Sequence, residues 1–285
     1  MDTAAAPQAA PLDPGLQLVL PGRSVTFGQA LSWIPRSWTL FKKAPLMWIL
    51  SLLILMVGNV VLQLVPVIGA IAVNLLQPVY MAGFAVACRS LETGGEFELE
   101  QILAGFKTRS TDLLIIGALL LLGMLVIVAV FGALFVALIG WAALSGLVDA
   151  VISNDPQRAA DLVQGMWLPT LLAFLTAMLL VVPLMAAYWF APYLTLMHAV
   201  KPVAAMKESL MACVRNFFQM FVYGLGMLVV GLVVALPAII PILGWIFTMC
   251  AYLVLAMMSI AAIYTSYRDI FTEEVSRPAA ATVTL

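Results

Sequence analysis

Four long stretches of the sequence contain no Asp, Glu, Lys or Arg, and they limit the possible folds more than any other feature. They are residues 44–88, 113–148, 162–200 and 216–267. The chain of 285 residues is 64% hydrophobic and 9% charged. In soluble proteins, about 45–50% of the residues are apolar and about 25% are charged. So few charges cannot cover a surface that faces water. The sequence therefore predicts an all-α, polytopic transmembrane bundle, and it excludes a soluble enzyme and a nucleic-acid-binding protein, which needs a basic face.

The lengths of these stretches predict about six membrane spans, because one span needs about 20 apolar residues. The first and last stretches hold two spans each, since Pro and Gly residues mark a turn at 65–69 and another at 237–244. The two middle stretches hold one span each. The predicted spans are about 46–64, 68–88, 113–137, 167–190, 217–236 and 243–266.

The parts outside the spans are short. The membrane domain is predicted to cover residues 24–271, between a disordered Ala- and Pro-rich tail at 1–23 and a disordered tail at 272–285. Residues 138–152 fit either a re-entrant segment or an interfacial helix.

The distribution of basic residues predicts the orientation. Every Lys and Arg except Arg158 falls on the side of the predicted membrane that carries both termini. By the positive-inside rule, the N-terminus and the C-terminus are expected in the cytoplasm.

Three segments on that side have the spacing of short amphipathic helices, within residues 27–41, 97–107 and 202–217. We expect Pro35 to break the first one into two pieces. Such helices either bind anionic lipid headgroups or a second membrane protein, or they cap the bundle as structural joints. The basic residues that we single out as lipid or partner contacts are Arg89, Lys201, Lys207 and Arg215.

Four carboxamides lie in the first predicted hairpin. They are Asn59 and Gln63 on its first helix and Asn74 and Gln77 on its second. Amides in lipid seek each other, so these residues are predicted to form either a polar clasp of the hairpin or the lining of a substrate path.

The residues that carry chemistry are scarce. There is one histidine, His198, and no metal-binding, phosphate-binding or hydrolase motif accompanies it. The three cysteines are interpreted as small buried hydrophobic residues. We therefore predict no catalytic residue, no cofactor and no metal, and we expect that the protein is not an enzyme.

Several phrases together resemble a known group of proteins. These are SWTLFKKAPLMWI, PVYMAGFAVACRSLETGG, APYLTLMHAVKPVAAMKESLMACVRN and SYRDIF. The chain looks like a member of a family of uncharacterised six-helix inner-membrane proteins of proteobacteria. It is more distantly similar to the YciC-like proteins and to the membrane domain of some glycerophosphodiester phosphodiesterases. The resemblance covers about residues 24–271, and its most specific positions are Pro192, Pro202, Ala205, Ser209 and Asn216.

The resemblance implies a location in the bacterial inner membrane and a six-helix fold. It implies no hydrolase activity, because the catalytic barrel of the phosphodiesterases is missing. The leading hypothesis is a non-enzymatic accessory or scaffold protein that acts through contacts with lipids or with other membrane proteins. The alternative is a transporter or flippase-like carrier for a lipid or a small neutral solute.

Overall fold

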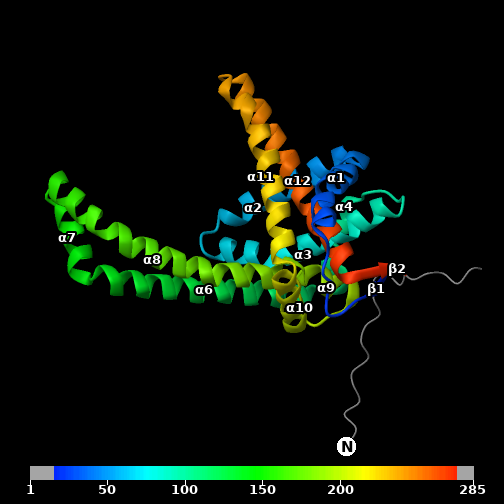
Figure 1. Cartoon of the computed structure of the whole chain (residues 1–285), viewed down its shortest axis with the longest axis horizontal. Helices are drawn as coiled ribbons and strands as arrows, with labels where there is room; N and C mark the ends of the chain where they lie inside the picture. Colours follow the sequence, from blue (N-terminus) through cyan, green and yellow to red (C-terminus); the bar gives the residue numbers. More distant parts are fainter. Residues whose placement is uncertain (1–15, 275–285) are drawn as a thin grey trace, which may run out of the picture. The chain divides into compact units, whose positions relative to one another are not determined.

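The computed structural model describes residues 16–274, and these are helical almost throughout (Figure 1). Six helical stretches are long and apolar enough to cross a membrane, which confirms the predicted all-α, six-span fold class. They are Pro45–Gln63 (α2), Ile68–Glu92 (α3), Ser110–Ile139 (α6), Pro156–His198 (α8 and α9), Phe217–Ile239 (α11 and η1) and Leu243–Phe271 (α12).

The shorter elements connect these stretches or divide them. They are β1 (Leu16–Leu18), α1 (Phe27–Lys43), α4 (Leu99–Ile102), α5 (Ala104–Thr108), α7 (Trp141–Ile152), α8 (Pro156–Trp189), α9 (Ala191–His198), α10 (Pro202–Arg215), α11 (Phe217–Ala235), η1 (Leu236–Ile239) and β2 (Thr272–Glu274).

The chain divides into two compact units. Unit 1 comprises Met1–Ala118 and Ala186–Leu285, and unit 2 comprises Leu119–Met185. In unit 2 the helices α6 and α8 lie side by side and α7 joins them (Figure 1). Residues 141–152, for which the sequence left two possibilities, thus form a separate short helix.

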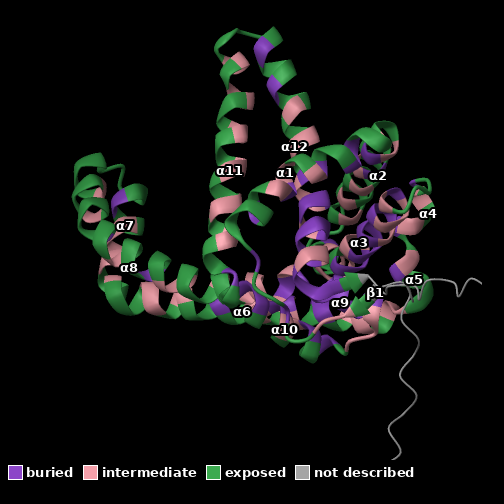
Figure 2. Cartoon of the chain, turned by 45° about the vertical axis from the view of Figure 1, so that its right-hand side comes forward, coloured by how far each residue is buried: buried purple, intermediate pink, exposed green. Residues whose placement is uncertain are grey.

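The core of unit 1 is built around α9. Every residue from Ala191 to Met197 is buried, and the helix packs against α3 and α10. Aromatic rings from neighbouring segments complete this core, with Phe190 against Phe271 and Tyr193 against Tyr267. Figure 2 shows the contrast with α11, which has no buried residue.

Both predicted hairpin turns are present, and each depends on a glycine. A Cβ atom at Gly69 would lie 1.9 Å from the carbonyl oxygen of Leu62, and one at Gly244 would lie 1.7 Å from that of Pro237. No real Cβ atom tolerates such distances, so any side chain at either position would force the two helices of the hairpin apart.

The prediction that Pro35 divides the first amphipathic segment is wrong. The helix α1 runs without a break from Phe27 to Lys43 with Pro35 inside it. A proline removes one backbone hydrogen bond. Here a capping box of Thr26 and Gln29 secures the start of the helix, and the apolar face packs on α11 and α12. These contacts outweigh the lost bond.

The helix that contains the fourth predicted span begins at Pro156, before the predicted start of the span near residue 167. The added turns are polar, so a search for apolar residues misses them. The carboxylate of Asp155 accepts a hydrogen bond from the backbone N–H of Arg158 at 3.1 Å, and this bond supports the start of the helix.

The predicted tail boundaries are also wrong where the structure describes them. Residues 16–18 form β1, which pairs antiparallel with β2 at 272–274. Beyond the strands, the N–H of Arg23 donates to the carbonyl of Ile270 at 2.8 Å. Pairing between two short backbone segments does not require a pattern of apolar residues, so the sequence does not indicate it. The rest of both predicted tails, 1–15 and 275–285, lies outside the described residues.

Candidate functional site

The charged residues of unit 1 gather where α1, α3 and α12 meet, and Glu92 at the end of α3 is the first centre of this cluster. Its carboxylate accepts hydrogen bonds from the Tyr264 hydroxyl at 2.6 Å and from Arg89 Nη1 at 3.2 Å. It also forms an ion pair with Arg268, whose Nε lies 2.9 Å away. Lys43, at the end of α1, donates to the neighbouring carbonyl of Leu91. One carboxylate therefore connects α3 to α12.

Asp269 is the second centre, and it joins α12 to α1. Arg36 Nη1 donates to both carboxylate oxygens of Asp269, at 2.7 and 2.8 Å, and Trp33 Nε1 donates to one of them at 2.8 Å. Trp33 is buried and Asp269 is partly buried. We call the residues Arg36, Arg89, Glu92, Arg268 and Asp269 the ion-pair network.

The segment before α1 is fastened to the junction of α10 and α11. The Asn216 side chain accepts a hydrogen bond from the N–H of Val25 at 2.9 Å and donates to the carbonyls of Arg23 at 3.1 Å and Ala212 at 3.0 Å. Arg215 donates to the carbonyl of Gly22. Asn216 is fully buried, so the structure uses its side chain to hold the N-terminal segment.

A cleft of about 290 Å³ lies between this segment and the ion-pair network. Its charged lining consists of Arg23, Arg36, Arg268, Asp269 and Glu273. The positive and negative charges nearly balance, and Arg36 and Arg268 already bind carboxylates. The cleft therefore offers little net attraction for an anion.

The break between α8 and α9 is held by Ser209 of α10. Its hydroxyl oxygen accepts a hydrogen bond from the N–H of Phe190 at 2.9 Å, and the hydroxyl donates to the carbonyl of Ala186 at 2.6 Å. Cys213, one turn further along α10, donates to the same carbonyl at 3.4 Å. Burial raises the pKa of Cys213 to about 12, so its thiol is protonated and inert at neutral pH, as a structural cysteine should be.

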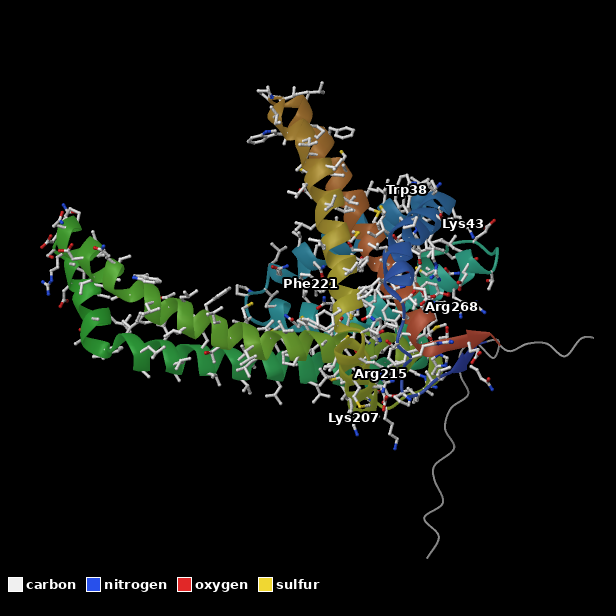
Figure 3. All side chains as sticks on the ribbon, in the orientation of Figure 1. Trp38, Lys43, Lys207, Arg215, Phe221 and Arg268 are labelled. Atoms are coloured by element: carbon white, nitrogen blue, oxygen red, sulfur yellow. The ribbon has the colours of Figure 1, made fainter. Side chains whose placement is uncertain are left out.

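The four basic residues that the sequence singled out have different surroundings. Arg89 bonds to Glu92 inside the ion-pair network, and Arg215 bonds to Gly22. Lys201 and Lys207 are exposed on α10 and its N-cap, and Figure 3 shows Lys207 projecting away from the helix. Two of the four thus have structural bonds, and the two lysines face outward.

The structure does not join the four carboxamides. Asn74 donates to the carbonyl of Ala70 in its own helix at 2.8 Å. Among residues 16–274, no hydrogen bond links any two of Asn59, Gln63, Asn74 and Gln77. They also do not line the cleft described above.

The imidazole of His198 is hydrogen-bonded to the side chain of a tyrosine. Its Nε2 lies 2.6 Å from the hydroxyl oxygen of Tyr267. Within the part of the chain that the structure describes, no group of three or more His, Cys, Asp or Glu residues is placed to hold a metal ion.

Sequence reasoning missed the ion-pair network. Its members come from helices far apart in the chain, since 233 positions separate Arg36 from Asp269. One signal was available in a chain so poor in charge. The second and the last of the six long helices each end with an arginine close to a carboxylate, at Arg89 and Glu92 and at Arg268 and Asp269.

The six long apolar helices define the class of the molecule, a multi-pass integral membrane protein, and the charged cluster lies at the ends of two of them, α3 and α12. The chain is 32% identical over 257 residues to the probable inner membrane protein BTH_II0599 of Burkholderia thailandensis, which covers 84% of this chain and 89% of the relative. It belongs to the same family of inner-membrane proteins. No protein-family model matches the sequence, and no solved structure matches it.

Proposed function

We propose that this chain is a non-enzymatic accessory or scaffold protein that acts through contacts with anionic lipid headgroups and with neighbouring membrane proteins. The observation that carries the proposal is the separation of the charged residues into two groups. The ion-pair network bonds to itself and holds helices together. Lys201 and Lys207 are exposed and have no carboxylate partner among the described residues.

The apolar surface supports the same proposal. No residue of α11 is buried. Leu225, Leu228 and Leu232 on this helix are apolar, and each is more than half exposed. The apolar surface of such a helix must be covered by lipid or by another membrane protein, because it is unfavourable in water. The hairpin of α11 and α12 therefore offers a contact surface within the membrane.

The proposal places both termini and α10 in the cytoplasm. Its basis is the side on which the Lys and Arg residues fall, with Arg158 as the exception. Lys201 and Lys207 would then lie next to the anionic inner leaflet, where each lysine contributes about 1 kcal/mol of attraction.

The distant similarity to YciC-like proteins and to the phosphodiesterase membrane domain fits a shared fold and not a shared reaction. The five positions that carry this similarity are all buried. Ser209 and Asn216, two of them, make hydrogen bonds that hold backbone segments. Residues with such roles preserve an architecture without specifying a substrate.

A carrier for a lipid or a small neutral solute has less support. It would need the amides of Asn59, Gln63, Asn74 and Gln77 to converge on a path, and they do not bond to one another. Gln63 and Gln77 are exposed.

The test is photo-crosslinking in cells that express the full chain. A photoreactive phenylalanine analogue replaces Lys207, and in a control variant it replaces Arg158, which is also exposed. We expect one or a few discrete protein or anionic-lipid adducts from position 207 and none of the same adducts from position 158. Identical adducts from both positions, or none from 207, would refute the proposal.

A further inference from the structure

A long apolar groove runs along one side of the hairpin of α11 and α12, next to α1. Its volume is about 410 Å³, within the range of about 300–1,000 Å³ that is typical of ligand sites. Val230 and Val234 of α11 form one wall, residues of α12 from Phe247 to Met258 form the other, and Trp38 of α1 contributes to its lining.

The shape of the groove suits a flexible chain. Eleven helical steps separate Phe247 from Met258, and at 1.5 Å a step they span about 16 Å. The lining contains no charged residue, and Cys250 is its one thiol. An extended hydrocarbon chain can lie along such a surface without desolvating a polar group.

One side of the groove also carries a positive charge. Lys42 Nζ lies 5.8 Å from the ring centroid of Trp38, in a cation–π contact. Lys42 is exposed, and within the described residues it makes no ion pair with a carboxylate. Figure 3 places Trp38 on α1 close to α12. A tryptophan beside a lysine is the pair that proteins use where a lipid tail meets its headgroup.

The opposite side of the same hairpin provides a comparison. A second groove, of about 480 Å³, is lined by residues of α11 and α12 that include Gly224, Gly231 and Tyr252. No lysine or arginine lines it. The two grooves are similar in size, but the second is more polar, because Tyr252 and Ser259 are part of its lining. Neither lining contains a cation, and the first groove differs in that Lys42 lies beside its Trp38.

We propose that the groove beside Trp38 binds one anionic phospholipid. An acyl chain lies along α12 between Phe247 and Met258, and the headgroup phosphate meets Lys42. This inference rests on the membrane location used under the proposed function, but it concerns residues other than Lys201 and Lys207, so either can fail without the other.

The test is native mass spectrometry of the full-length protein in detergent. The protein is mixed with phosphatidylglycerol or with phosphatidylcholine of the same acyl chains. Three variants are compared with the wild type: Lys42→Gln removes the cation, Ala251→Leu fills the groove, and Ala256→Leu fills the opposite groove as the matched control. Each variant is first checked for the elution volume and the melting temperature of the wild type.

We expect the wild type to retain one phosphatidylglycerol several-fold better than phosphatidylcholine. Lys42→Gln should reduce that preference by about fivefold, the effect of one basic residue near an anionic headgroup. Ala251→Leu should abolish retention of both lipids, and Ala256→Leu should leave it unchanged.

Three results would overturn the proposal. One is an unchanged lipid preference in Lys42→Gln. Another is equal lipid retention by Ala251→Leu and Ala256→Leu. The third is a dimer mass without lipid that Ala251→Leu eliminates, which would make a second copy of this chain the occupant.

Discussion

Replacing Glu92 with alanine should destabilise the protein more than any other single change to an exposed or half-exposed carboxylate. Glu92 is 29% exposed, and its two arginine partners, Arg268 and Arg89, are 10% and 15% exposed. The change removes the carboxylate that both guanidinium groups share and the acceptor of the Tyr264 hydroxyl.

The size of the effect follows from this burial. Breaking a fully buried ion pair costs about 3–5 kcal/mol, and exposed pairs contribute about 0–1 kcal/mol. Because Glu92 is partly exposed, we expect the free energy of unfolding to fall by about 3 kcal/mol, the lower end of the buried range. One kcal/mol lowers the melting temperature of a chain of this size by roughly 2–4 °C, so Glu92→Ala should lower it by about 6–12 °C.

The assay is thermal unfolding in detergent, followed by intrinsic tryptophan fluorescence. Glu100→Ala is the matched control, because Glu100 pairs with Lys107 at the surface, where both side chains are more than half exposed. Lys107 lowers the pKa of Glu100 through a hydrogen bond and its charge, but this pair joins two short helices within one loop. We expect the control to keep the wild-type melting temperature. If Glu92→Ala melts no lower than Glu100→Ala, the ion-pair network does not hold the helices together.

Three further predictions concern buried contacts. Ser209→Ala should lower the free energy of unfolding by about 1–3 kcal/mol, because it leaves the N–H of Phe190 without a partner. The control is Ser259→Ala, which should lower it far less in the same melting assay, because the Ser259 hydroxyl bonds within its own helix. Gly83→Ala should prevent α4 from packing on α3, since the new Cβ would lie 2.1 Å from the carbonyl oxygen of Ile102. The control Gly58→Ala should fold normally, because its Cβ meets open space. Gel filtration distinguishes a folded variant from a misfolded one. With its pKa at about 12, Cys213 as the sole cysteine should react with maleimide at pH 8 at least tenfold more slowly than a cysteine that replaces Lys207; equal rates would contradict its burial.

The spans were predictable because membrane helices follow a local rule, the absence of charge over about 20 residues. The turns were predictable for a similar reason, since Pro and Gly residues at 65–69 and 237–244 have few other uses between apolar helices. These features depend on neighbours in the sequence alone.

Features that depend on tertiary contacts were not predictable. Pro35 lies inside a helix because packing on α11 and α12 compensates for the bond that it removes. The segment that contains β1 and Val25 is held by β2 and by Asn216, which are far from it in the sequence. Glu92 and Asp269 became centres of a network only when the fold brought α1, α3 and α12 together. No hydrogen bond joins any two of the four amides among the described residues, because similar depth in a hairpin does not ensure that two side chains meet.

The central claim is that the protein acts by contact with other membrane components. The most direct measurement is extraction of the tagged full-length chain into native nanodiscs, followed by mass spectrometry of every protein and lipid in the particle. The account predicts a stoichiometric membrane-protein partner or an enriched anionic lipid, and a lower amount of either in a Lys201→Gln/Lys207→Gln variant. A monodisperse particle with bulk lipid composition, from a protein that moves lipid or solute across reconstituted vesicles, would contradict it.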